Sequence, residues 1–143
     1  MTDVIRRSGE QRQAAIEDSA AALGIDEAFV SALVDTFYAR VRQDDLIGPV
    51  FETAIGDDWD AHLAKLKDFW SAISLGTRRY NGRPMPAHLR LEGLTPLHFQ
   101  RWLALFRTTL DEIAPNPAVA DFFHDRASMI GRNFQAVMAA VRP

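Results

Sequence analysis

The segment YNGRPMPAHLRL, residues 80–91, places one histidine, His88, directly behind two prolines. Each proline biases the residue before it toward extended backbone, which leaves room for about one helical turn around His88. A neutral imidazole is a good ligand for iron when a stiff backbone aims it and a second hydrogen bond orients its other ring nitrogen. The segment therefore indicates a histidine that is presented to a metal or a prosthetic group.

Three further side chains could act beside it, namely Tyr38, His62 and Trp102, because each falls on the apolar stripe of a different predicted helix. A buried hydroxyl, imidazole or indole without a hydrogen-bond partner costs roughly 1–3 kcal/mol. One interpretation is a polar network in which the three satisfy one another within the core. Taken with His88, the alternative is a haem pocket, which needs an axial imidazole, an aromatic slot and polar groups on the open side.

The chain holds nine phenylalanines and three tryptophans, and several could grip a flat macrocycle: Phe51, Phe69, Trp70 and Phe106. An aromatic stripe at helical spacing more often fills a core, so these four residues do not decide between the two interpretations. His98 and His124 are expected to be surface or hydrogen-bonded histidines. Neither forms a His-x-x-x-His or Glu-x-x-His pattern on one helix face.

Composition excludes several other kinds of protein. The absence of cysteine excludes disulfides, thiolate catalysis and cysteine-bound zinc or haem. A net charge of −3 offers no basic surface for nucleic acid, and no run of about 18 apolar residues predicts a membrane span. No nucleophile elbow or phosphate-binding glycine loop occurs, and the aspartates of GDDWD suit a helix start. A cytoplasmic protein without nucleic-acid or membrane partners is expected.

Glycine and proline divide the chain into segments of helical length, and strictly alternating β-branched runs are missing, so the predicted fold class is all-α. We expect residues 1–25 to form an extension with a short peripheral helix from about residue 11 to 23, and residues 26–143 to form one domain. Its predicted helices start after Asp26, near residue 50, at Asp57 or Asp58, after Thr95 and after Asn116.

The motifs FYARVR, GPVF, DFW, YNGRPMPAH and FQRW, in this order and spacing, closely resemble those of the group III truncated haemoglobins. The resemblance runs from about residue 26 to the carboxyl end. It implies a truncated globin fold, which is a two-over-two helical sandwich around one non-covalently held haem b. A monomer is expected.

The resemblance also implies roles for individual residues. His88 matches the proximal histidine on the iron, and Tyr38, His62 and Trp102 match residues of the distal pocket. The remaining residues expected to contact the haem or its propionates are Phe51, Lys65, Leu66, Phe69, Trp70, Tyr80, Arg90 and Phe106. An amino-terminal extension longer than that of the family's shortest members is a departure without an assigned role.

A five-coordinate haem iron that binds O₂ and other diatomic ligands follows from these roles. Hydrogen bonds from Tyr38 and Trp102 to a polarised O₂ predict slow release, and His62 could gate the pocket or donate a proton. One function class is oxygen binding for transport, storage or sensing. A second is an enzyme, a nitric oxide dioxygenase or peroxidase-like protein served by an unidentified reductase. A haem-free helical interaction module is the third.

Overall fold

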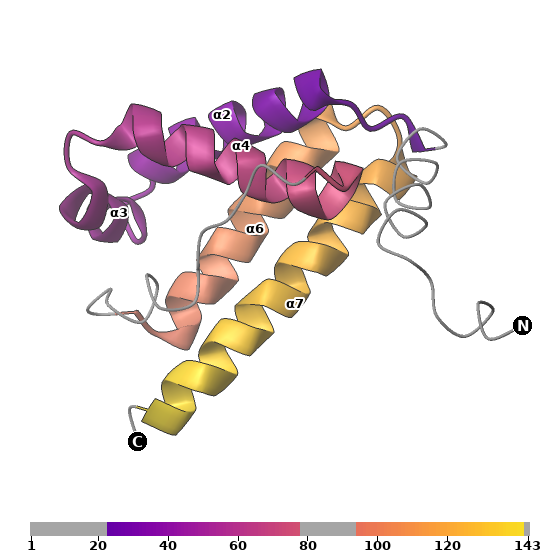
Figure 1. Ribbon diagram of the computed structural model, residues 1–143. Coiled ribbons are helices and arrows are strands. Elements are labelled where there is room, and N and C mark those ends of the chain that lie inside the picture. Colours follow the sequence, from indigo (N-terminus) through magenta and orange to yellow (C-terminus); the bar gives the residue numbers. More distant parts are fainter. Residues whose placement is uncertain (1–22, 78–93, 142–143) are drawn as a thin grey trace, which may run out of the picture.

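The computed structural model describes residues 23–77 and 94–141 (Figure 1). The described residues form helices only, which are α2 (Glu27–Gln43), α3 (Gly48–Ile55), α4 (Trp59–Leu75), α6 (Pro96–Ile113) and α7 (Pro117–Val141). This confirms the predicted all-α class and all five helices predicted for this part of the chain. The predicted helix over residues 11–23 and the turn around His88 lie outside the described residues, apart from residue 23 itself.

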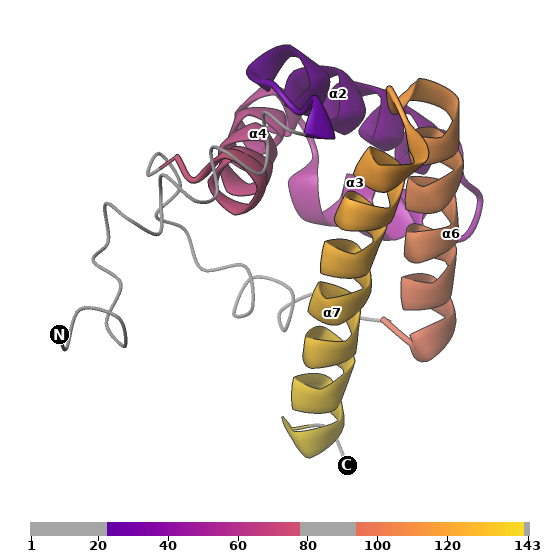
Figure 2. The ribbon, with the colours of Figure 1, turned by 90° about the vertical axis from the view of Figure 1, so that its right-hand side faces the viewer.

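The helices form two pairs that cross. Helices α6 and α7 lie side by side in both views, and α2 and α4 lie across one end of that pair (Figure 1, Figure 2). Helix α2 is central, because it packs against α3, α4 and α6, while α6 also packs against α7. This arrangement is the predicted two-over-two sandwich.

Polar side chains begin three helices as predicted. Asp26 accepts a hydrogen bond from a first-turn backbone N–H of α2 at 2.8 Å, and Asn116 does the same for α7 at 3.0 Å. Before α6, Nδ1 of His98 accepts from the backbone N–H of Thr95 at 3.2 Å, so these two residues form a capping box. His98 is thus the hydrogen-bonded histidine that the sequence predicted.

Helix α4 begins where the sequence predicted and ends at a glycine. Asp58 occupies the N-cap position and Asp60 lies in the first turn, although the side chain of Asp58 makes no capping hydrogen bond. At the other end, Gly76 adopts a left-handed φ of 71°, which a residue with a side chain adopts at a cost.

The core is built on aromatic rings from four helices. Trp70 of α4 stacks on Phe106 of α6 with ring centroids 5.2 Å apart, and Phe37 of α2 meets Phe106 edge-on at 4.9 Å. Phe123 of α7 lies 5.7 Å from Trp70 and is fully buried. Burying each such ring contributes roughly 1.5–3 kcal/mol, so these contacts hold the two helix pairs together. Met129 of α7 does not join this core, since 47% of it is exposed.

The connection from α2 to α3 is tight. Asp44 Oδ2 accepts from the backbone N–H groups of Leu46 and Ile47 at 3.0 and 2.9 Å, and Oδ1 accepts from Arg101 of α6 at 2.7 Å. A Cβ on Gly48 would lie 3.0 Å from two carbonyl oxygens at the end of α2, so only glycine fits there without a shift. These contacts set the position of α3 relative to α2 and α6.

Among the described residues, no helix is long and apolar enough to cross a membrane.

Replacing Asp44 by alanine should lower the free energy of unfolding by roughly 1–3 kcal/mol, because three donors lose their partner. The matched control is Asp45→Ala, since Asp45 is 97% exposed and its carboxylate lies 3.6 Å from Arg101. This control should change stability by about 0.5 kcal/mol or less. Urea unfolding of both variants measures the difference, and equal losses would contradict the assigned role.

The effect of Asp44 should also depend on pH. Burial acts to raise the pKa of Asp44, but hydrogen bonds from Ile47, Arg101 and Leu46 outweigh it and hold the pKa below its ordinary value. The pKa of Asp44 is lower in the folded chain than in the unfolded chain, where it is about 4, so the ionised carboxylate stabilises the fold above that pH. This stability is lost as the pH falls through the pKa of the folded state. The gap between the wild type and Asp44→Ala should therefore narrow below about pH 4.

Candidate functional site

Tyr38 lies on the inner face of α2 and is 4% exposed. Burial raises the pKa of its hydroxyl to about 12, and a smaller opposite effect comes from a hydrogen bond with the side chain of Trp102. An indole nitrogen can only donate, so Trp102 is the donor and the Tyr38 oxygen is the acceptor. Tyr38 therefore keeps its own proton at neutral pH and can pass a hydrogen bond on.

Trp102 is held in place by the rings of the core. Its indole is parallel to the ring of Phe106, at an interplanar angle of 1° and a centroid distance of 5.7 Å, and it meets Phe37 edge-on at 5.9 Å. Stacking of this kind restricts the rotamer of a large flat side chain. The indole N–H is consequently aimed at Tyr38 by the packing between α2 and α6.

His62 stands between two aromatic rings. Its imidazole is nearly perpendicular to the ring of Tyr38, at 6.1 Å and 89°, and to that of Trp59, at 5.8 Å and 86°. The residue as a whole is half-buried, and the Nε2 atom of its ring is buried. Tyr38, His62 and Trp102 thus come together from α2, α4 and α6, as the sequence predicted.

An apolar cleft that is partly open to solvent lies beside this cluster. Among the predicted site residues that the structure describes, Phe51 of α3 and Trp102 line it, and Phe51 also contacts Tyr38 at 5.9 Å. The lining residues that sequence reasoning missed are Ile47, Val50, Leu94, His98, Phe99 and Phe134.

Two of these missed residues carry a signal that could have found them. Phe99 and Phe134 form a small buried cluster apart from the main core, with Leu94 packed against it. Their ring centroids lie 6.4 Å apart, across α6 and α7. In the sequence, Phe99 comes one turn before Trp102 on the same apolar stripe, so a predicted pocket at Trp102 could have been extended to it.

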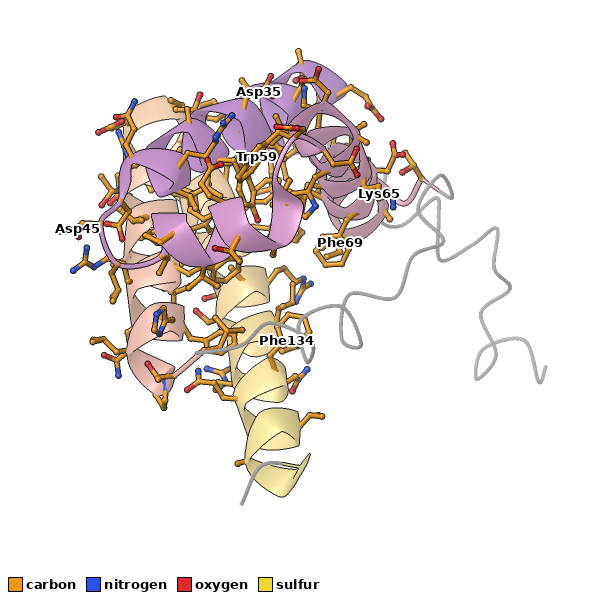
Figure 3. All side chains as sticks on the ribbon, turned by 90° about the vertical axis from the view of Figure 1, so that its left-hand side faces the viewer. Asp35, Asp45, Trp59, Lys65, Phe69 and Phe134 are labelled. Carbon is orange, nitrogen blue, oxygen red and sulfur yellow. The ribbon has the colours of Figure 1, made fainter. Side chains whose placement is uncertain are left out.

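The other predicted haem contacts divide into three groups. Leu66 and Phe69 are half-buried on α4, where Figure 3 shows Phe69 pointing toward the side of α7 that carries Phe134. Lys65 is exposed on the same helix. Trp70 and Phe106 lie in the main core, 2% and 1% exposed, and do not line the cleft. Three predicted residues lie outside the described part of the chain: Tyr80, His88 and Arg90.

The described residues fit a haem on one side. The cleft wall is mostly apolar and partly aromatic, which suits a flat macrocycle, and Trp102 joins that wall to the hydroxyl of Tyr38. Polar donors that converge beside an apolar slot also match the distal side of a haem pocket. The iron ligand predicted at His88 belongs to residues 78–93, so its placement stays a prediction.

Comparison with known proteins gives matches over most of the chain. The family model described as bacterial-like globin matches residues 21–131. The chain is 36% identical over 117 residues to the group 3 truncated hemoglobin ctb of Campylobacter jejuni, covering 80% of this chain and 91% of the relative. It is 26% identical over 111 residues to the group 2 truncated hemoglobin YjbI of Bacillus subtilis, covering 76% and 83%.

A solved structure agrees with these relatives. The crystal structure of the group III truncated hemoglobin from Campylobacter jejuni superposes with a TM-score of 0.76 at 35% identity, covering 80% of this chain and 91% of the other. Haem-based binding of small ligands is the general activity of globins. The sandwich of helices, the motifs and the matches agree, and this chain therefore belongs to the bacterial-like globin family, among the group III truncated haemoglobins.

Proposed function

We propose that this chain holds haem b through His88 as a five-coordinate iron protein and binds O₂ or another diatomic ligand beside Tyr38, His62 and Trp102. Residues 26–143 would form the binding domain and residues 1–25 an extension to it. The observation that carries the proposal is the convergence of a hydroxyl, an imidazole and an indole from three helices beside an apolar cleft. The haem supplies an iron that takes the small ligand, and the chain supplies everything around it.

Tyr38 is the main hydrogen-bond donor to the ligand in this proposal, because the single N–H of Trp102, which was also expected to donate to O₂, donates to Tyr38 instead. Its oxygen accepts from Trp102, and its own proton is left for a polarised ligand. Successive hydrogen bonds of this kind strengthen one another in a low-dielectric interior. Because burial raises the pKa of Tyr38 to about 12, the donor keeps its proton throughout the physiological range.

The half-buried His62 has a second role in the proposal. Its ring stands edge-on to Tyr38 on a residue that is only partly buried, so an outward rotation of the side chain would control access to the pocket. An imidazole can also hand a proton to a peroxide ligand. Lys65, Arg90 and Tyr80 are the proposed partners of the haem propionates, where cationic and hydroxyl groups suit carboxylates.

The successive hydrogen-bond donors around the ligand would hold O₂ tightly and release it slowly. Slow release suits redox chemistry better than oxygen transport. We therefore place conversion of nitric oxide with O₂ to nitrate, or reduction of peroxide, ahead of transport or storage. Either reaction requires an electron source, which would be a separate reductase. A cytoplasmic location, which we also propose, would give the protein access to such a reductase.

Replacing His88 by alanine should abolish stable haem retention, since the iron would lose its protein ligand. Titration of the purified protein with haemin, followed through the Soret band, measures this loss. The matched control is His98→Ala, because His98 also lines the cleft but serves the capping box of α6. That control should keep haem and lose about 0.5–1 kcal/mol of stability. Unchanged retention in His88→Ala would contradict the assignment, and a wild type that takes up no haemin would favour an interaction module.

Replacing Tyr38 by phenylalanine should speed O₂ dissociation by roughly tenfold to a hundredfold, the equivalent of losing a charge-assisted hydrogen bond of about 1.5–3 kcal/mol. Stopped-flow mixing of the oxygenated protein with dithionite measures the rate. Dissociation of CO is the control, because CO is less polarised than O₂ and should change far less. Equal changes for both ligands would mean that Tyr38 only fills space.

Repeated turnover separates an enzyme from a carrier. The oxygenated protein is mixed with nitric oxide in the presence of a reductant, and nitrate is counted per haem. We expect many nitrate molecules per haem, because the site holds O₂ while nitric oxide arrives. A yield of one nitrate per haem, with no recovery of the oxygenated form, would instead support a ligand-binding role alone.

A further inference from the structure

Trp59 is the first residue of α4 and stands one helical turn before His62. It is 5% exposed, although it opens a helix at the surface. Its ring meets the imidazole of His62 edge-to-face at 5.8 Å and lies 6.3 Å from the ring of Tyr38. Any movement of the imidazole away from Tyr38 toward solvent therefore changes its contact with Trp59.

Two partly exposed side chains, those of Glu52 and Arg42, hold the indole of Trp59. Its Nε1 donates to Glu52 Oε2 of α3 at 3.4 Å, and the guanidinium carbon of Arg42, near the end of α2, lies 4.5 Å from its ring centroid. Glu52 Oε1 accepts from Arg42 Nε at 2.8 Å, so one carboxylate connects the other two side chains. Three helix ends thus meet on a single tryptophan.

We propose that Trp59 is a positioning residue for His62, and that Glu52 and Arg42 hold its indole so that the imidazole stays against Tyr38. The proposal rests on the proposed function, because it treats His62 as the group that controls access to the ligand. It extends the site from the pocket to the surface network of Glu52 and Arg42, neither of which is among the described residues that line the cleft.

This network should affect the position of the Trp59 indole much more than it affects the stability of the fold. Glu52 and Arg42 have side chains 43% and 46% exposed, and ion pairs of that exposure contribute little to folding. A cation placed over a ring and a carboxylate at its N–H nevertheless allow only one orientation of the indole. The hydrogen bond from Arg42, opposed by a smaller effect of burial, also lowers the pKa of Glu52, which keeps the carboxylate charged at neutral pH.

The test compares Glu52→Ala and Trp59→Leu with the wild type in the full chain. Both changes should raise the bimolecular rate of CO association, measured by flash photolysis, by about threefold to tenfold, because the outward position of the imidazole becomes more populated. In the CO-bound protein, the nuclear Overhauser contact between the rings of residues 59 and 62 should weaken in Glu52→Ala. The conservative variant Glu52→Gln keeps an acceptor oxygen and should stay within about twofold of the wild type.

Glu112→Ala is the matched control, because Glu112 forms a similarly exposed ion pair with Arg40 at 2.6 Å, which links α2 to α6 instead. It should leave both the CO rate and the ring contact unchanged. The proposal is overturned if Glu112→Ala raises the rate as much as Glu52→Ala, or if Trp59→Leu binds CO at the wild-type rate.

Failure of the proposed function has a different signature. If the wild-type chain takes up no haem, no CO rate exists, and the ring contact between residues 59 and 62 is then measured in the haem-free protein. Loss of that contact in Glu52→Ala, but not in Glu112→Ala, still supports the positioning of His62 by Trp59. Retention of the contact in Glu52→Ala overturns it.

Discussion

A tyrosine hydroxyl enclosed by aromatic rings needs a hydrogen-bond partner, and much of this structure follows from how that need is met. Trp102 supplies the partner from α6, and its indole is oriented by stacking on Phe106. An unsatisfied hydroxyl at this depth would cost roughly 1–3 kcal/mol, so the crossing of α2 and α6 is constrained to keep the two side chains together. Because its oxygen accepts that hydrogen bond, the Tyr38 hydroxyl can still donate its own proton.

The short helix α3 depends on polar contacts to reach this cluster. Asp44 ties the turn before α3 to Arg101 of α6, and Gly48 lets the backbone approach the end of α2 closely. Phe51 is carried inward as a result, where it lines the cleft and contacts Tyr38. Further along the same helix, Glu52 points outward to Arg42 and Trp59. One helix of eight residues thus serves both the cleft and the outer network.

Membership of the bacterial-like globins explains why so many rings gather in a chain of 143 residues. Trp70 and Phe106 build the main core, whereas Phe99 and Phe134 form a separate cluster on the cleft. A globin of this length has few residues with which to separate a ligand pocket from a core. In this structure Trp102 serves both, because its ring stacks on the core and the same residue lines the cleft.

The helices, and the inward position of the candidate site residues on them, follow from local sequence. Caps at Asp26, Thr95 and Asn116 and the stop at Gly76 are local, because each depends on backbone groups within a few residues. The 3.6-residue period then placed Tyr38, His62 and Trp102 toward one core. Local sequence does not settle every position, since Asp58 makes no capping hydrogen bond and Met129 is exposed.

Packing between the helices sets which rings share a surface. Burial on an inner face does not distinguish Trp70, in the core, from Phe51, on the cleft, because that depends on the helix packed opposite. The contact of Trp59 with Glu52, Arg42 and His62 likewise joins ends of three helices, and no periodicity within one helix encodes it. Long-range packing sets these partners, since the crossing geometry of whole helices determines which side chains meet.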